Sequence, residues 1–286
     1  MSVALVTDST ASLPAQTVSD YGITVVPLQV VIGATSYDES GDEDSVTPQM
    51  LADALKEWTP VSTSRPNPEA ILETYEKLAA DGAEAIVSVH ISGELSGTFE
   101  SAQLAARRCS LPVTLVDSRQ VGMGTGYAVL AAAEAIAGGA DAETAGAAAR
   151  TRAANTTSLF YVDTLEYLRR GGRMGAAAAL LGSALAVKPI LRVEDGQIRP
   201  FEKVRTSAKA LSRLEELAVE AAADAEVDVA VAHLASPDRA ADLADRLAKR
   251  LEAGLGEREV SLGEIGAVLG AHVGPGMVAV AVSRRS

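Results

Sequence analysis

Hydrophobic positions in the first half of the chain form short apolar runs that alternate with longer stretches of helical spacing. Short apolar runs are typical of buried strands, and longer amphipathic stretches are typical of helices. Strands are expected at residues 3–7, 23–26, 29–32, 85–90 and 113–116. Helices are expected at residues 48–57, 68–80, 97–108, 127–136 and 142–154. This alternation predicts a mostly parallel sheet with helices on both faces.

The pattern changes after a further strand at residues 158–162. Two apolar runs around the turn Glu194-Asp195-Gly196 predict a β-hairpin, and two long helices are expected to flank one more strand. The hairpin strands are residues 188–193 and 197–203, the helices residues 207–223 and 237–255, the strand residues 227–232, and short apolar stretches follow at 260–262, 267–269 and 278–282. We expect a mixed sheet with helices on one side. The sequence therefore predicts an α/β protein of two domains, residues 1–156 and 157–286.

Composition removes several classes of function. The net charge of −13 repels a phosphate backbone, and aromatic residues at 3% give few platforms for base stacking, so no nucleic-acid partner is expected. Cys109 is the only cysteine, which leaves no intramolecular disulfide and no multi-cysteine metal site. No apolar run has membrane-spanning length and the first residues lack a signal-peptide pattern, so a cytoplasmic location is expected.

Two segments rich in hydroxyl groups precede predicted helices. Ser62-Thr63-Ser64 lies before Pro66 and Pro68, and Ser92 and Ser96 follow the strand that ends near residue 90. Such hydroxyls commonly cap helices, and Ser96 is a candidate N-cap. One cap would suffice for the first segment, so its surplus hydroxyls favour a ligand-facing loop. The second segment begins a helix at the carboxyl end of a strand, where exposed N–H groups favour a phosphate or carboxylate.

Two glycine-rich segments of the second half carry the remaining candidates. Gly171 and Gly172 allow a sharp turn before Arg173, whose guanidinium could pair with a carboxylate or phosphate; a solvated basic turn is the alternative. His272 is predicted to lie in a loop between two apolar strands, where it could donate to an anion or titrate. The other histidines, His90 and His233, end or follow strands and are assigned structural roles.

The sequence offers no complete catalytic motif. The segment Gly93–Gly97 spaces its serine wrongly for a nucleophile elbow, and the segment Gly122–Gly126 lacks the full dinucleotide fingerprint. No phosphate-binding Gly-Lys-Ser/Thr loop occurs. The carboxylates Asp8, Asp117 and Asp163 have no metal-ligand spacing, so neither a catalytic centre nor a metal site nor a cofactor is expected.

Taken in order, short motifs along the whole chain resemble the DegV family of bacterial fatty-acid-binding proteins. The motifs are Val6-Thr7-Asp8-Ser9-Thr10-Ala11, Val26-Pro27-Leu28, Thr63-Ser64-Arg65-Pro66, Leu95-Ser96-Gly97-Thr98-Phe99, Val116-Asp117-Ser118, Phe160-Tyr161-Val162, Leu168-Arg169-Arg170-Gly171-Gly172-Arg173, Lys203-Val204-Arg205 and His272-Val273-Gly274-Pro275-Gly276. Each motif is weakly specific, but the order and spacing of the set are highly specific.

The resemblance implies a carrier without its own catalytic site. A long-chain, palmitate-like fatty acid would lie in a buried apolar tunnel, and its carboxylate would lie near the cleft between two domains. The carboxylate-binding residues that the resemblance implies are Thr63 and Ser96, with Ser64 and Ser92 as second choices, together with Arg173 and His272. In relatives a separate kinase phosphorylates the presented fatty acid.

Two positions depart from the family pattern. Arg65 stands where relatives commonly carry Gln, and Gly93 stands where they often carry Ser, so both could alter contacts with the head group.

Two other classes of function compete with the carrier. One is an enzyme, either a phosphotransferase related in fold to dihydroxyacetone kinases or a serine hydrolase that uses Ser96 and His272 on a small carbonyl or ester substrate. The other is a regulatory module that senses fatty acids. The missing motifs disfavour the enzyme, whereas the sequence does not separate a sensor from a carrier.

A stretch of the second half reverses the sign of the overall charge. Between Arg169 and Arg213 ten basic residues face only three acidic ones, Glu194, Asp195 and Glu202. The ten are Arg169, Arg170, Arg173, Lys188, Arg192, Arg199, Lys203, Arg205, Lys209 and Arg213. A solvated face is the usual explanation, but the excess also suits an acidic face of a kinase partner, with Arg199, Lys203 and Arg205 as contacts.

Overall fold

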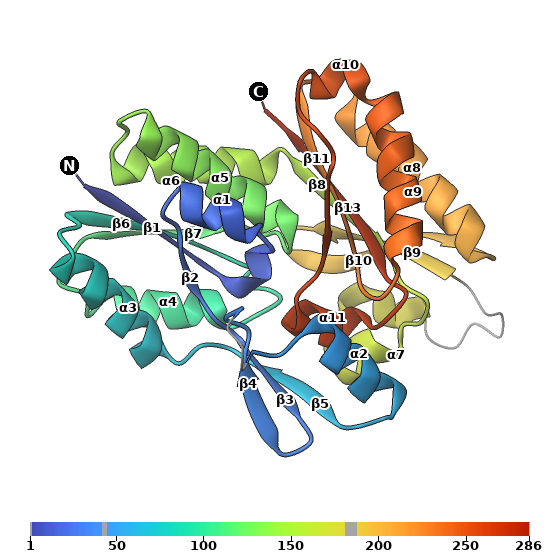
Figure 1. Cartoon of the computed structure of the whole chain (residues 1–286), viewed down its shortest axis with the longest axis horizontal. Helices are drawn as coiled ribbons and strands as arrows, with labels where there is room; N and C mark the ends of the chain where they lie inside the picture. Colours follow the sequence, from blue (N-terminus) through green and yellow to red (C-terminus); the bar gives the residue numbers. More distant parts are fainter. Residues whose placement is uncertain (1, 42–44, 181–187, 286) are drawn as a thin grey trace.

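A computed structural model describes residues 2–41, 45–180 and 188–285 of the chain. It contains two large sheets, one in each half of the chain, and a small third sheet below the second (Figure 1). Within the described ranges no helix combines the length and the apolar character that crossing a membrane requires.

The first sheet is parallel throughout, as predicted. Its strand order is β2-β1-β6-β7, formed by β1 (Val3–Asp8), β2 (Thr24–Val26), β6 (Ala85–His90) and β7 (Val113–Asp117). Helices cover both faces (Figure 1): α3 (Pro68–Ala80) and α4 (Thr98–Ala106) lie on one side, and α1 (Ala15–Asp20), α5 (Met123–Ala137) and α6 (Ala142–Ala154) on the other. Because neighbouring side chains of a strand point to opposite faces, Val6 packs with α3 and α4 while Leu5 packs with α5 and α6.

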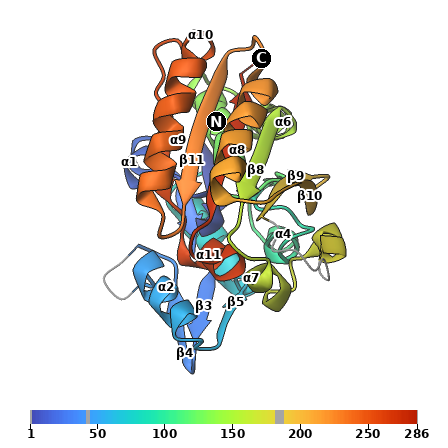
Figure 2. The same ribbon diagram turned by 90° about the vertical axis from the view of Figure 1, so that its right-hand side faces the viewer.

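The second sheet is mixed, also as predicted. Its order is β10-β9-β8-β13-β11-β12, in which only β11 and β12 pair in parallel. The strands are β8 (Thr156–Tyr161), β9 (Lys188–Glu194), β10 (Gln197–Val204), β11 (Val227–His233), β12 (Ser261–Glu264) and β13 (Val278–Arg284). One face packs against α8 (Ser207–Ala222) and α9 (Pro237–Arg250), which the short α10 (Glu252–Leu255) follows (Figure 2).

The small sheet was not predicted. It has the order β4-β3-β5, with β3 (Gln29–Ile32), β4 (Thr35–Asp38) and β5 (Val61–Ser64), and α2 (Pro48–Lys56) connects β4 to β5. The expectation that Ser62-Thr63-Ser64 lie in a loop was therefore wrong, because these residues belong to β5 and pair with β3. The next helix is capped by Asn67 Oδ1, which accepts from the backbone N–H of Glu69 at 3.1 Å. The three hydroxyls are therefore not needed as the cap of this helix.

The expectation that His272 lies in a loop between two strands was also wrong. Residues 267–273 form a helix, α11 (Ala267–Val273), which ends at Gly274 with a φ of 74°. Gly270 lies inside this helix because its backbone approaches Leu51 closely: a Cβ atom there would come within 2.6 Å of the Leu51 side chain. Glycine here serves helix packing and does not mark a loop.

The small sheet and α2 pack against the second half of the chain. Leu28, Val30, Leu51 and Leu55 share one buried cluster with a group of later residues. That group includes Phe160, Val162, Leu168, Leu191, Leu234, Ile265, Val268 and Met277. The chain passes from the first large sheet to the second near residue 156. Residues 28–55, although early in the chain, contribute to the core of the second half. A boundary at residue 156 stays a prediction.

An ionic cluster joins the two halves at the far end of the second sheet. Asp228 of β11 contacts Arg152 of α6, Arg285 at 2.7 Å and Arg258 at 3.4 Å. Arg285 also pairs with Glu134 of α5 at 3.0 Å. Only 16% of the Asp228 side chain and 10% of the Arg152 side chain are exposed, so water screens this cluster weakly.

Replacing Asp228 by Ala should lower the free energy of unfolding by about 2–4 kcal/mol, because three guanidinium groups would lose their shared counter-ion. Urea denaturation followed by circular dichroism measures the change. Glu143→Ala is the matched control, since it breaks the exposed Arg150–Glu143 pair and should change stability little. Equal effects of the two substitutions would contradict a stabilising role of the cluster.

Candidate functional site

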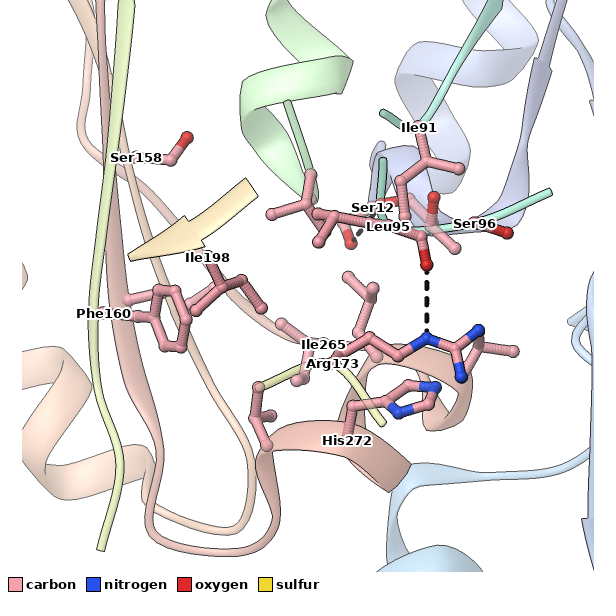
Figure 3. A pocket seen from close by; sticks show the side chains of 18 of the residues that line it. Ser12, Ile91, Leu95, Ser96, Ser158, Phe160, Arg173, Ile198, Ile265 and His272 are labelled. Carbon is pink, nitrogen blue, oxygen red and sulfur yellow. Dashed lines mark hydrogen bonds between the residues drawn. The ribbon is translucent and has the colours of Figure 1, made fainter. Parts of the chain in front are cut away.

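A cavity of about 380 Å3 lies between the two large sheets. Its walls come from the loops after β1 and β6, from β5, from α11 and from the uncovered face of the second sheet. Figure 3 shows Ile91, Leu95 and Ser96 on one side and Phe160 and Ile198 on the other. Most of the lining is aliphatic, and its polar side chains include a group at one end, where Thr63 lies beside His272 and Arg173 reaches the carbonyl of Leu95, the residue before Ser96.

Strand alternation explains why Thr63 is the hydroxyl that turns inward. In β5, Val61 and Thr63 are half-buried while Ser62 and Ser64 are exposed. The Oγ1 of Thr63 lies 2.9 Å from Nε2 of His272, although the two residues are 209 positions apart. The small sheet thus brings an early hydroxyl to a late imidazole.

His272 is held as a neutral imidazole. Burial, together with the positive charge of nearby Arg173, lowers its pKa to about 4. Its Nδ1 is enclosed and has no hydrogen-bond partner among the described residues, and it lies so close to Gly171 that a Cβ there would approach it within 2.1 Å. A proton on Nδ1 would be buried without an acceptor among the described residues, so we assign the proton to Nε2, which then donates to Thr63. The hydroxyl proton of Thr63 is then free for a ligand.

Backbone carbonyls from both halves of the molecule position Arg173. Its Nε donates to the carbonyl of Leu95 at 3.2 Å (Figure 3). Its Nη1 donates to the carbonyl of Gly171 at 2.6 Å. No carboxylate neutralises the guanidinium within the described ranges. A fixed, uncompensated cation beside an apolar cavity favours an anionic ligand group.

Ser96 lies on the opposite side of the same polar end. Its Oγ is 2.8 Å from Oγ1 of Thr98 and accepts from the Thr98 backbone N–H at 3.3 Å. The N-cap position itself is Gly97, so Ser96 precedes the N-cap of α4 by one residue, and it lines the cavity.

The other sequence candidates are placed differently. Ser64 lines the rim and is exposed, and its Oγ donates to the carbonyl of Arg65 at 3.2 Å. Ser92 is fully buried outside the lining, where its Oγ donates to the carbonyl of Gly196 at the tip of the β9–β10 hairpin, 2.8 Å away. The structure therefore brings together Thr63, Ser64, Ser96, Arg173 and His272 but not Ser92.

The two residues that depart from the family pattern lie in different places relative to the cavity. Arg65 lies at the rim of the cavity, pairs with Glu100 and donates to the carbonyl of Gly97 at 3.3 Å. Gly93 is exposed outside the lining, and its N–H donates to Asp117 at 3.2 Å. Of the two, only Arg65 is placed to influence a bound head group.

A Ser-His-Asp arrangement exists in the molecule, away from the cavity. His90 Nδ1 lies 2.9 Å from Asp8, and its Nε2 lies 2.8 Å from the hydroxyl of Ser88, which also accepts from Tyr75. All four side chains are fully buried, so no substrate reaches Ser88. The structural role expected for His90 fits this network. Among the described residues no cluster of His, Cys, Asp or Glu is placed to hold a metal ion.

The Gly122–Gly126 segment serves packing at the cavity wall. A Cβ on Gly124 would approach the hydroxyl of Ser158 within 2.6 Å, and one on Gly126 would approach the carbonyl of Ala11 within 2.7 Å. The absence of side chains lets the first turn of α5 lie directly on its neighbours.

The sequence reasoning missed the residues that form the apolar wall. In β11 and β13 valine alternates with alanine, and the alanines Ala230, Ala232, Ala279 and Ala281 line the cavity. This alternation is visible in the sequence. The alternation alone does not show which face of the strands borders a cavity. It could therefore have suggested a wall of small residues but not its position in the fold.

Fold and site together define an α/β protein with two large sheets and a largely apolar cavity that carries a cation and hydroxyl groups in its lining. Known proteins share this whole architecture. The model of a family described as "Uncharacterised protein, DegV family" matches residues 2–285. A DegV domain-containing protein of Streptomyces coelicolor is 54% identical over 283 residues, covering 99% of each chain. The chain belongs to the DegV family.

Solved structures agree with this assignment. One from Thermus thermophilus, titled "Fatty Acid Binding of a DegV family Protein", is 33% identical, has a TM-score of 0.91, and is matched over 100% of its length by 99% of this chain. DegV from Bacillus subtilis, titled a fatty acid binding protein, is 32% identical with a TM-score of 0.89, and both chains are covered completely.

The low pKa of His272 predicts a specific pH dependence. Between about pH 6.5 and 4 the folded chain holds fewer protons on this residue than the unfolded chain does, so stability falls as the pH drops through that range. Relative to a His272→Gln variant, the wild type should lose about 1–2 kcal/mol of unfolding free energy between pH 7.5 and pH 5.

Urea denaturation of both proteins at the two pH values measures this difference. In NMR spectra the His272 imidazole should begin to titrate only below pH 5. Parallel stability curves and an ordinary titration midpoint would show that His272 is not held neutral by its surroundings.

Proposed function

We propose that this protein binds one long-chain fatty acid, with the acyl chain in the cavity and the carboxylate at its polar end. The observation that carries the proposal is that a mostly aliphatic cavity has Thr63 beside His272, and Arg173 bonded to the carbonyl that precedes Ser96, in its lining. The two solved DegV structures, from Thermus thermophilus and Bacillus subtilis, are described as fatty acid binding, which supports the same ligand class for this chain.

The energetics suit such a ligand. Each buried methylene contributes about 0.8 kcal/mol, so a palmitate-length chain gains on the order of 12 kcal/mol before the cost of immobilising it. The carboxylate is the difficult part, because a buried charge without partners is very costly. The freed Thr63 proton, the Ser96 hydroxyl and the Arg173 guanidinium offset that cost.

The same geometry favours a carrier over the competing enzymes. A serine hydrolase needs a histidine that activates its serine, but the hydroxyl beside His272 Nε2 belongs to Thr63, and Ser96 contacts Thr98. The Nδ1 of His272 has no carboxylate to orient it among the described residues. A phosphotransferase would need groups that hold a nucleotide or a metal ion. The polar groups of the cavity lining are instead a few cations and hydroxyls within an aliphatic wall, which disfavours this activity.

We further propose that a kinase phosphorylates the presented carboxylate in the cytoplasm and docks on a basic surface formed by Lys203, Arg205 and Lys209. All three side chains are exposed. The structure reduces the number of unpaired positive charges in the stretch from Arg169 to Arg213, because most of the other basic residues there pair with nearby acidic residues. Arg169 and Arg170 pair with Glu166, Lys188 with Asp163, Arg192 with Glu194, Arg199 with Glu194 and Asp195, and Arg213 with Glu202, Glu216 and Glu220.

Protein produced in bacteria should yield stoichiometric fatty acid on organic extraction, detected by mass spectrometry. The Thr63→Ala and Ser96→Ala variants should each bind palmitate about 1–3 kcal/mol more weakly, because each removes a partner of a buried charge. Ser62→Ala is the matched control, since this hydroxyl lies on the outer face of the same strand. An empty wild-type protein without affinity for palmitate would overturn the proposal.

Reversing Lys203, Arg205 and Lys209 to Glu should slow kinase-dependent acyl-phosphate formation at least about tenfold at low salt and leave palmitate binding unchanged. The effect should shrink as salt increases, because salt screens exposed charges. A triple reversal of the exposed Lys77, Arg107 and Lys249 controls for net charge. If both triple variants support the wild-type rate, the basic surface is only a solvated face.

A further inference from the structure

The two central strands of the second sheet have a bulky face and a small face. In β11 and β13 the valines Val227, Val229, Val231, Val278, Val280 and Val282 all belong to the core under α8 and α9. The alternate residues that face the cavity are Ala230, Ala232, Ala279 and Ala281. Strands favour β-branched residues, so four alanines on these central strands, two of them buried and two half-buried, give up packing that valine would provide.

Strand register arranges these small residues in rows across the sheet. Ala232 lies opposite Ala279, which lies opposite Phe160 of β8; this is the near row. Ala230 lies opposite Ala281, which lies opposite Ser158; this is the far row. In Figure 3, Phe160 and Ser158 lie on the side of the cavity away from Arg173. The two rows are about 7 Å apart, the rise of two residues in a strand.

The next row beyond the far row is polar. Asp228 lies opposite Ser283, which lies opposite Thr156. Thr156 and Ser283 have their hydroxyls 2.7 Å apart, and Asp228 contacts Arg152. An alkyl chain that entered this row would break bonds between buried polar groups without replacing them.

The far row is also closed from the side of α5. Tyr127 and Met123 pack against Ala230 and Ala281. The hydroxyl of Ser158 donates to Oε1 of Gln120 at 2.9 Å, and Nε2 of Gln120 donates to the carbonyls of Ala153 and Thr156 at 3.2 and 2.9 Å. Ser158 therefore has its partner already and leaves an inert wall for a terminal methyl group.

We propose that the far row, formed by Ser158, Ala281 and Ala230, is the stop that sets the longest acyl chain this protein holds. The near row is a passage that the chain crosses. This inference rests on the proposed fatty-acid binding, and it assigns chain-length selection to residues that do not touch the carboxylate.

Two substitutions test the stop, with dissociation constants measured for laurate, palmitate and stearate after delipidation. Ala281→Leu fills the far row, so palmitate and stearate should bind at least about tenfold more weakly while laurate binds as in the wild type. Ala279→Leu blocks the near row and should weaken all three ligands by at least that factor. Ala281→Val should show the same order of preference with smaller changes.

Val229→Leu is the matched control, because it adds volume to the opposite face of β11 and should leave the preference unchanged. Thermal unfolding of each delipidated variant verifies that it folds. If Ala281→Leu does not fold, the chain-length preference of Ala281→Val is the test of the inference. A folded Ala281 variant with the wild-type preference for palmitate and stearate overturns the inference. Failure of the wild type to bind any of the three acids overturns the proposed function instead.

Discussion

The packing of residues 28–64 against the second half of the chain is the constraint on which the site depends. Thr63 reaches His272 only because β5 lies on α11, and α11 is held in turn by Leu51 against Gly270. Glu39 of the same region accepts from the backbone N–H of Val268 at 2.9 Å and so fixes the first turn of α11. If this packing loosened, the hydroxyl and the imidazole would separate, and the polar end of the cavity would lose its geometry.

Electrostatic roles at that end are divided among residues of different kinds. Arg173 supplies the positive charge, and its proximity together with burial keeps His272 neutral. A neutral imidazole that donates to Thr63 makes the threonine a donor rather than an acceptor toward the ligand. Beside His272 the cavity thus offers the Arg173 cation and a directed hydroxyl proton, which suits a single carboxylate. At its other end, hydrogen bonds that are already complete leave nothing for a ligand to bind except apolar surface.

The sequence predicted the large sheets because most of their strands are short apolar runs separated by longer helical stretches. It missed the small sheet because residues 35–38 are Thr-Ser-Tyr-Asp and residues 61–64 carry three hydroxyls, so neither strand has an apolar run. Thr63, Ser96, Arg173 and His272 were predicted from motif resemblance, and the structure gathers them. Ser92 shows the limit of that reasoning, because a hairpin distant in sequence binds its hydroxyl.

The shared core has a consequence for the order in which the chain is made. Leu28, Val30, Leu51 and Leu55 leave the ribosome well before Phe160, Leu234 and Val268, which cover them in the finished protein. At about 5–20 residues per second, the early side chains wait on the order of ten seconds for the first of those partners. The parallel sheet can complete its own strands while residues 28–64 are still uncovered. Nascent chains of this protein therefore display an apolar surface to chaperones until the residues of the later core have been made.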